Sequence, residues 1–408
     1  MRELELYIHI PFCMKKCDYC DFLSAPADEK SQSAYMEGLK REIAYYGEKL
    51  AETTVTTIYI GGGTPSWLQE SYIAELMEEV RKHFNLAKNA EISIECNPGT
   101  LTKGKLECYL KSGINRLSIG LQSTDNEELQ NLGRIHTYEQ FLRNYELARE
   151  CGFKNINIDL MNALPKQTVE KYYDTLMKVI RLNPEHISSY SLIIEKGTPF
   201  YDRYKFDLVK QEAGLRTEEL PSENTIYQMG KMSEDVLAEH GYRRYEISNY
   251  SKRGYECRHN IGYWQRKEYL GVGLGASSLL NEVRYSNLTN LGQYIEKSLH
   301  IEELQIDGKI STQTPSHAVA GVTNLHAEAN EISKNAQMEE FMFLGLRMIN
   351  GIEKSDFYRA FGFTVDHIYG KIVRKLQDQE LIVDTPTRLF LTERGLDLSN
   401  YVLAQFLL

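Results

Sequence analysis

Hydrophobic and polar positions follow a repeating strand–helix rhythm through the first 195 residues. Apolar runs rich in β-branched residues occupy 4–10, 56–60, 91–95, 116–121, 155–160 and 186–192. Segments with helical spacing lie between them, at 31–51, 69–84, 102–112, 137–151 and 168–182. Strands and helices that alternate in this way predict βαβ units with a parallel sheet. Six units are too few for a closed eight-stranded barrel, which leaves an open partial barrel or a doubly wound sheet.

The remaining chain changes character three times. Residues 196–300 lose the rhythm and predict an α+β extension that lengthens the sheet or caps its open side. Residues 295–340 contain no aromatic side chain, so 301–334 is predicted to be a linker or loop. Helical patterns at 338–349 and 366–379, followed by short strands at 381–383 and 389–391, predict a helical, winged-helix-like domain over 335–408. The expected α/β domain is 1–195.

Polar residues stand where several strands of the predicted sheet end. A cysteine-rich loop follows the first strand, and the run GGGTP at 61–65 follows the second. Glu95, Gln122 and Asp159 end, or lie near the end of, the next three strands. The glycine run is either a tight turn or a backbone opened toward a ligand, and it lacks the lysine and spacing of nucleotide-binding loops. Because ligands of parallel α/β proteins bind beyond the carboxyl ends of strands, one shared site is expected.

Composition narrows the class of protein. The 408 residues are 42% hydrophobic and 25% charged, which is typical of a globular protein with more than one domain. A net charge of −10, with no basic excess in the C-terminal block, argues against a nucleic-acid partner. No signal-peptide pattern and no run of ~18 apolar residues is evident, so a cytoplasmic protein is expected.

Three of the seven cysteines form the sharpest local pattern. Cys13, Cys17 and Cys20 have the spacing C-x3-C-x2-C, which in a reducing compartment predicts a metal site. Closed zinc and ferredoxin-type sites need four ligands, so one metal position would stay open. An iron–sulfur cluster is favoured. Zinc is the alternative, because His9 would complete a Cys3His set.

These motifs carry a family resemblance. The cysteine loop with Tyr19 before its last cysteine, and the GGGTP run, resemble the radical S-adenosylmethionine superfamily. The segments YIHIPFC, GGGTPS, IECNPGT, SIGLQS, NLGR and NIDLMNALPKQT resemble oxygen-independent coproporphyrinogen III dehydrogenase and its relatives. The resemblance covers nearly the whole chain. It implies a partial (β/α)6 barrel with an α+β extension and a C-terminal winged-helix-like domain.

The resemblance also implies cofactors and their ligands. The three cysteines would bind three irons of a [4Fe–4S] cluster, and S-adenosylmethionine would chelate the fourth. Tyr7, Gly62 and Glu95 match positions that bind this first molecule. Positions assigned to a second S-adenosylmethionine match Gly63, Thr64, Gln122, Arg134 and Asp159. The implied chemistry is one-electron cleavage of the sulfonium to a 5′-deoxyadenosyl radical, with flavodoxin or ferredoxin as electron donor.

Two departures favour a different branch of this family. The dehydrogenase has a fourth cysteine where this chain has Phe22, and it has an N-terminal arm, whereas here the cysteines begin at residue 13. Both features match the HemW-like haem-chaperone branch. That branch has an H-N-x-x-Y-W motif associated with haem, matched here by His259, Asn260, Tyr263 and Trp264.

A haem ligand is not fixed by this motif. Cys257 offers a thiolate as an alternative, and His259 and Trp264 also suit hydrogen-bonded core residues. The resemblance implies a chaperone that carries haem to acceptors such as respiratory cytochromes, cytoplasmic but reaching the membrane through partner proteins. The alternative function is the dehydrogenase itself or another radical tetrapyrrole enzyme. Whether the radical step is used, and the oligomeric state, stay open.

Overall fold

The six expected strands form one parallel sheet in a computed structural model that describes residues 2–304 and 322–408. The strands are β1 (Arg2–Ile10), β2 (Thr53–Gly62), β3 (Asn85–Cys96), β4 (Arg116–Gln122), β5 (Ile156–Asn162) and β6 (His186–Ser191). They are hydrogen-bonded in the order of the chain. A doubly wound sheet reverses its strand order at a switch point, and this one does not. The fold is therefore the partial (β/α)6 barrel.

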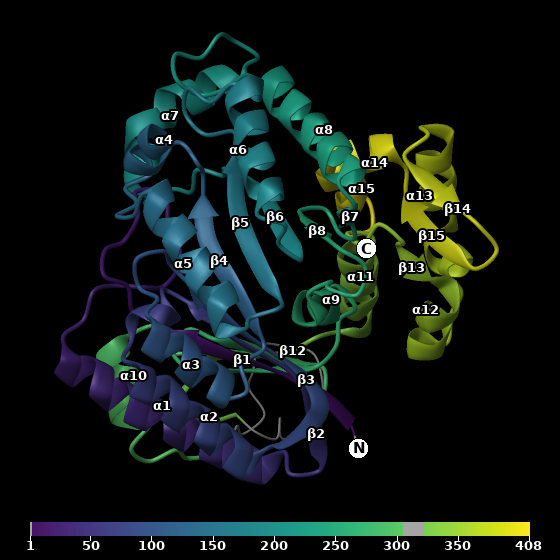
Figure 1. The fold of residues 1–408 in the computed structure, drawn as a ribbon. Coiled ribbons are helices and arrows are strands. Elements are labelled where there is room, and N and C mark those ends of the chain that lie inside the picture. Colours follow the sequence, from purple (N-terminus) through teal and green to yellow (C-terminus); the bar gives the residue numbers. More distant parts are fainter. Residues whose placement is uncertain (1, 305–321) are drawn as a thin grey trace.

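The connecting helices also lie where the sequence predicts them. They are α1 (Glu29–Lys49), α2 (Glu70–His83), α3 (Lys103–Lys111), α5 (Tyr138–Cys151) and α6 (Val169–Arg181), with two short additions, η1 (Pro65–Trp67) and α4 (Asn126–Asn131). Local signals fix their ends. Thr137 and Gln140 form a capping box at the start of α5, and Gly152 ends this helix with φ 107°. These helices cover the outer face of the barrel strands (Figure 1).

The barrel strands alternate between an apolar outer face and a polar inner face. On β1, Leu4, Leu6 and Ile8 are fully buried on one face, whereas Glu5 and His9 belong to the other. Alternation with a period of two continues through β2 to β6. The inner positions across these strands are Thr57, Tyr59, Glu91, Ser93, Glu95, Arg116, Ser118, Asn157, Asp159, His186 and Ser188. Many parallel strands are apolar on both faces, so this interior is built for polar contacts.

The region 196–300 lengthens the sheet at both edges, as expected. It contains α7 (Pro199–Glu212), α8 (Glu223–Glu239), β7 (Arg243–Arg244), β8 (Asn249–Ser251), α9 (Arg258–Trp264), β9 (Tyr269–Val272), β10 (Ser277–Leu280), β11 (Val283–Asn287) and α10 (Leu291–Lys297). β8 and β7 extend the edge at β6, and β9, β10, β11 and β12 (His326–Glu331) extend the edge at β1. The sheet thus has 12 strands.

Strand β12 corrects the prediction that 301–334 is only a linker or loop. It pairs antiparallel with β11, from Val283 opposite Glu331 to Asn287 opposite His326. Its sequence, HAEANE, is polar because β12 is an edge strand whose side chains are mostly exposed. Strands are recognised in a sequence by their hydrophobic pattern, and β12 has none. Its lack of aromatic residues was therefore interpreted as a linker. Residues 305–321 of the predicted linker lie outside the described residues.

The C-terminal block forms a unit with its own hydrophobic core and a three-stranded sheet in the order β13-β15-β14. Its elements are α11 (Lys334–Gly345), β13 (Ile352–Glu353), α12 (Lys354–Phe361), α13 (Val365–Asp378), β14 (Ile382–Asp384), β15 (Arg388–Leu391), α14 (Glu393–Asp397) and α15 (Ser399–Ala404). This arrangement confirms the winged-helix-like domain, although α12 and β13 were not predicted. The unit lies beside β7 and β8 (Figure 1), where Ile349 N donates to Tyr245 O at 3.0 Å.

No helix within residues 2–304 and 322–408 is both long and apolar enough to cross a bilayer.

Candidate functional site

A cavity of about 340 Å³ lies at the carboxyl ends of the barrel strands, and we call it the cysteine pocket. All the predicted cluster and cofactor residues except Tyr7 line it. They are Cys13, Cys17, Cys20, Tyr19, Gly62, Gly63, Thr64, Glu95, Gln122, Arg134 and Asp159. The structure therefore brings together residues from five strand ends and the loop after β1, as expected for a parallel α/β protein.

The cysteine loop is held by short-range contacts and by one arginine. Cys20 N donates to Cys17 O at 3.2 Å, which turns the loop back on itself. Burial raises the pKa of the Cys13 and Cys20 thiols above the usual range. Arg134 donates through Nη2 to Asn97 Oδ1 at 2.8 Å and to Gly120 O at 2.6 Å. This fixes its Nη1 at 3.8 Å from Cys17 Sγ.

His9 does not complete a zinc site, because both of its ring nitrogens are occupied. Nε2 lies 3.0 Å from Leu23 O and must donate to that carbonyl. Nδ1 is then an acceptor, and it takes the Tyr7 hydroxyl at 2.9 Å. The same contact directs the Tyr7 hydroxyl to His9, and Tyr7 is absent from the lining of the cysteine pocket, so its contact with a cofactor stays a prediction.

The three thiols line one cavity, a placement that an iron–sulfur cluster with three cysteine ligands requires. Across the described part of the chain, no three His, Cys, Asp or Glu side chains converge as ligands of one metal ion. In a four-iron cluster each thiolate binds a different iron, so the three sulfurs surround a volume instead of a point. The cysteine pocket provides such a volume, with Cys13, Cys17 and Cys20 on its wall.

The glycine run is a tight turn whose backbone forms part of the pocket wall. Gly62 has φ 114°, and its N–H donates to Glu95 Oε2 at 3.0 Å. A Cβ at Gly62 would lie 2.5 Å from the His9 ring, and a Cβ at Gly63 would lie 2.5 Å from Phe12 O. No larger residue fits either position without movement. The tight turn is therefore confirmed, and a backbone opened toward a ligand stays a prediction.

Two carboxylates, those of Glu95 and Asp159, line the cysteine pocket, and we call this pair the acidic floor. The Tyr59 hydroxyl donates to Glu95 Oε1 at 3.1 Å. Burial, with the nearby charge of Asp159, raises the pKa of Glu95 to about 7. Burial also raises the pKa of Asp159, which accepts from Ser118 Oγ at 3.0 Å and from Asn157 Nδ2 at 2.8 Å. A cationic ligand with hydroxyl groups, such as S-adenosylmethionine, suits this donor and acceptor set.

Sequence reasoning missed several residues of the pocket wall. Tyr59 on β2 and Ser118 on β4 also line the pocket, from inner positions that precede the predicted residues of these strands. Tyr190 lines it from β6. The period-two pattern of the strands carries this signal. Phe22 lies at the pocket, with 68% of its side chain exposed. Gln122 takes the left-handed conformation, φ 72°, which is strained for a residue other than glycine.

The H-N-x-x-Y-W motif forms α9, which packs inside the barrel against β1, β2 and β3. Glu91 of β3 accepts the backbone N–H groups of Arg258, at 3.1 Å, and His259, at 3.2 Å. Gly262 lies against Glu5, where a Cβ would come within 1.8 Å of the carboxylate. We call this helix the barrel plug.

His259 is therefore not presented as an open haem ligand, contrary to the sequence-based expectation. The residue is 1% exposed, with Nδ1 at 2.8 Å from Thr57 Oγ1 and Nε2 at 3.1 Å from the Tyr263 hydroxyl. Burial and the charge of Arg116 lower its pKa to about 3. The alternative ligand, Cys257, is fully buried beside Glu91.

The other motif residues also lie away from the cysteine pocket. Tyr263 packs edge-on against His259, with ring centroids 4.8 Å apart. The Trp264 ring lies under the Arg347 guanidinium, 4.4 Å from its centre. Asn260 is half-buried on the plug. The motif thus belongs to the packing of the barrel.

Comparison with known proteins identifies relatives along the whole chain. Residues 7–179 match the radical SAM superfamily model, and residues 332–398 match the HemN C-terminal domain model. The heme chaperone HemW of Lactococcus lactis subsp. lactis is 35% identical over 403 residues, covering 98% of this chain and 97% of the relative. The heme chaperone HemW of Bacillus subtilis is 32% identical over 407 residues, covering 98% of each.

A solved structure shares the fold. Coproporphyrinogen III oxidase (HemN) from Escherichia coli, a radical SAM enzyme, superposes with a TM-score of 0.81 over 100% of this chain and 90% of that one. The sequence identity is 23%, so the likeness concerns the fold.

Proposed function

Because the chain belongs to the HemW family of the radical SAM superfamily, we propose that it is a haem chaperone, which binds haem and delivers it to haemoproteins. The observation that carries this proposal is the likeness, over 98% of the chain, to relatives named heme chaperone HemW. Phe22 adds support, because the resemblance assigns a fourth cysteine to this position in the dehydrogenase.

The cysteine pocket would hold the cofactors that the superfamily implies. Cys13, Cys17 and Cys20 would bind a [4Fe–4S] cluster, and Gly62 and Glu95 would face the amino acid part of S-adenosylmethionine. When bound, this pair supplies one-electron chemistry at the sulfonium. Arg134 would help to position the cysteine loop, because its guanidinium is fixed beside the Cys17 sulfur. Gly63, Thr64, Gln122 and Asp159 line the same cavity and would take the rest of this ligand or a second molecule.

The dehydrogenase is the alternative function. It is supported by the fold of the solved coproporphyrinogen III oxidase, at 23% identity. In that case the acidic floor at Glu95 and Asp159 would serve catalysis on a tetrapyrrole.

Partners and location follow from the chaperone proposal. The acceptors would be haemoproteins such as respiratory cytochromes, which would bring a cytoplasmic carrier to the membrane surface. Lys15 and Lys16 lie exposed at the mouth of the cysteine pocket. They suit an acidic electron donor of the flavodoxin or ferredoxin type, which would approach the cluster there.

Haem binding and transfer test the proposal. The protein is reconstituted with cluster under anaerobic conditions, titrated with haem, and mixed with an apo-cytochrome. We expect one haem per chain and its transfer to the acceptor. In parallel, the protein with reductant and S-adenosylmethionine is given coproporphyrinogen III. Substrate-dependent 5′-deoxyadenosine and protoporphyrinogen would establish the alternative, and absence of stoichiometric haem binding would refute the chaperone function.

A further inference from the structure

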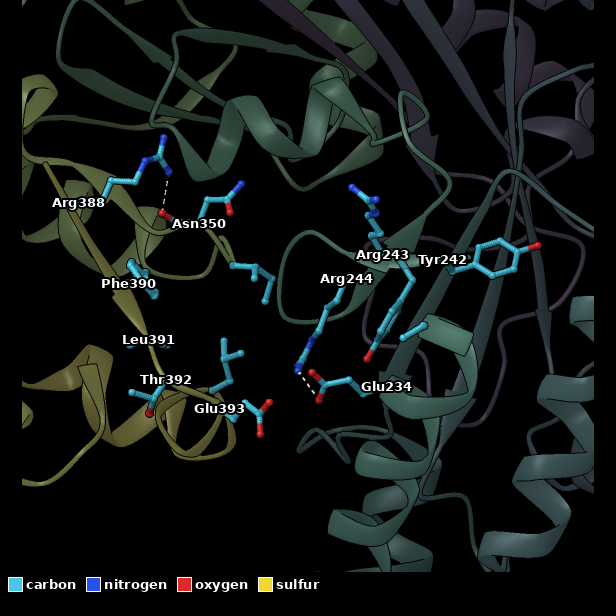
Figure 2. Close-up of a pocket in the computed structure, with 14 residues that line it drawn as sticks. Glu234, Tyr242, Arg243, Arg244, Asn350, Arg388, Phe390, Leu391, Thr392 and Glu393 are labelled. Carbon is cyan, nitrogen blue, oxygen red and sulfur yellow. Dashed lines mark hydrogen bonds and ion pairs between the residues drawn. The ribbon is translucent and has the colours of Figure 1, made fainter. Parts of the chain in front are cut away.

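A second large cavity lies between the barrel and the C-terminal unit, and we call it the interdomain groove. Its volume is about 740 Å³, larger than the cysteine pocket and within the range of small-molecule sites. One wall comes from α8, β7 and β8, and the other from the segment after α11, from β15 and from α14. Figure 2 shows the two walls on either side of a space, with Arg244 and Glu234 on one and Phe390, Thr392 and Glu393 on the other.

Flat and branched apolar side chains make up much of this lining. Tyr250 faces the groove from the barrel side. Phe390, Leu391, Ile349 and Leu396 face it from the other side. Tyr250 is 4% exposed and Arg244 lies over its ring, so the accessible apolar wall is that of the C-terminal unit, where Phe390 is half-buried. This wall suits one face of a wide planar apolar molecule, which buries a large area there.

Arginines stand at the edges of the groove, two of them fixed. Arg244 donates through Nη2 to Ile247 O at 2.6 Å and pairs with Glu234 at 3.4 Å. On the opposite wall Arg388 donates to Asn350 O at 2.9 Å (Figure 2). Arg243 is exposed, and its side chain has no hydrogen-bond or ion-pair partner within residues 2–304 and 322–408. A guanidinium free to make two parallel hydrogen bonds is suited to a carboxylate.

We propose that the interdomain groove is the haem-carrying site, with one porphyrin face against the apolar wall of the C-terminal unit and a propionate on Arg243. This inference rests on the proposed chaperone function and gives it a location. The described lining contains no His, Cys or Met. The porphyrin is therefore bound without a protein ligand of these kinds on iron, which leaves the metal accessible to the ligands of the acceptor.

The two tyrosines of the lining do not replace such a ligand. The Tyr242 hydroxyl donates to Pro184 O at 2.8 Å, so it is directed away from the groove. Burial raises the pKa of Tyr250 to about 12 and that of Tyr242 above its usual range. Both phenols stay protonated at neutral pH, and a neutral phenol binds ferric iron poorly.

Three porphyrins separate the contributions of iron and carboxylate. The full chain is titrated with haem, with iron-free protoporphyrin IX and with the dimethyl ester of protoporphyrin IX. We expect haem and protoporphyrin IX to bind with Kd values within about threefold, because the groove does not ligate iron. The dimethyl ester is expected to bind about tenfold more weakly, the order of effect of one charge-assisted pair.

Charge reversal tests the location. Arg243→Glu is expected to raise the Kd of haem and of protoporphyrin IX about tenfold and to leave the Kd of the dimethyl ester nearly unchanged. Arg253→Glu is the matched control, an exposed arginine outside the groove with the same change in net charge, and it should leave all three Kd values unchanged. Because Arg243 is exposed, the variant is expected to fold; its circular dichroism and thermal unfolding check this.

The outcomes distinguish this inference from the function on which it rests. If the wild type binds haem stoichiometrically but Arg243→Glu binds it equally well, the groove is not the site and the chaperone function stands. Haem binding far tighter than protoporphyrin IX would also overturn the groove, because it requires an iron ligand. If the wild type does not bind haem at all, the proposed function itself fails.

Discussion

Replacing Gly62 by Ala should destabilise the barrel through two separable effects. The first is the backbone, because Gly62 has φ 114°, a conformation that costs an L-residue about 1–2 kcal/mol. The second is steric, because the new Cβ would lie 2.5 Å from the His9 ring. That ring is held by Leu23 O and the Tyr7 hydroxyl, so moving it breaks up to two hydrogen bonds, each worth about 1 kcal/mol. The expected total is about 2–4 kcal/mol.

Gly152→Ala isolates the backbone effect. Gly152 has φ 107°, close to that of Gly62, but no atom lies within 4 Å of its Cβ position. Its substitution should cost about 1–2 kcal/mol, so Gly62→Ala is expected to exceed it by about 1–2 kcal/mol. Adding His9→Ala to Gly62→Ala should remove the steric part, which appears as a favourable coupling energy in a double-mutant cycle.

Tryptophan fluorescence during urea unfolding measures this. The chain has two tryptophans: Trp67 lies in the barrel, whereas Trp264 contacts Arg347 of the C-terminal unit. All variants are therefore made in a Trp264→Phe background, in which the signal follows the barrel. Equal free energies of unfolding for Gly62→Ala and Gly152→Ala would refute the reasoning. So would additivity between Gly62→Ala and His9→Ala.

Three further predictions concern titratable groups. Because Glu95 has a pKa of about 7, affinity for S-adenosylmethionine should rise from pH 6 to 8 as the carboxylate ionises, and calorimetry should find this rise absent in Glu95→Gln. His259→Ala should lower the free energy of unfolding by about 2–3 kcal/mol, because the hydroxyls of Thr57 and Tyr263 lose their partner. The haem Kd should stay within about twofold of the wild type. Lost haem binding at unchanged stability would contradict the plug assignment. Burial lowers the pKa of His259 to about 3, of His326 to about 4 and of His186 well below its usual range. The unfolded chain therefore takes up protons near pH 6.5 that the native chain does not. The free energy of unfolding present at pH 7 should fall between pH 6.5 and 4 by about 1.4 kcal/mol per pH unit per histidine. Denaturant titrations should show a smaller slope for His326→Gln.

The barrel could be predicted from the sequence because its signals are local. Apolar strands and helical segments alternate with strong periodicity, and capping residues such as Thr137 and Gly152 lie at the helix ends. Strand β12 carries no such signal. Its partner β11 lies more than 40 residues away along the chain, and its exposed edge position imposes no hydrophobic pattern.

The candidate site was partly predictable for a similar reason. Residues at strand ends converge because parallel strands finish at one edge, so Glu95, Gln122 and Asp159 were expected together. The role of Tyr7 was not predictable, since it depends on which acceptor the His9 ring offers in three dimensions. Arg134 was expected to bind a second S-adenosylmethionine, and it lines the cysteine pocket; its contacts with Asn97, Gly120 and the sulfur of Cys17 depend on the three-dimensional fold and were not predictable.

The H-N-x-x-Y-W motif shows why a motif associated with a ligand need not touch it. A barrel with a polar interior needs partners for its buried groups, since each unsatisfied one costs about 1–3 kcal/mol. The plug supplies them: His259 bonds Thr57, and its backbone satisfies Glu91. Trp264 at its end lies under Arg347, which follows α11 at the start of the C-terminal unit. The motif therefore fixes the C-terminal unit against the barrel, and this placement also sets the width of the interdomain groove. Trp264 would therefore act on a ligand bound between the two units without contacting it, whereas His259 contributes to the stability of the barrel.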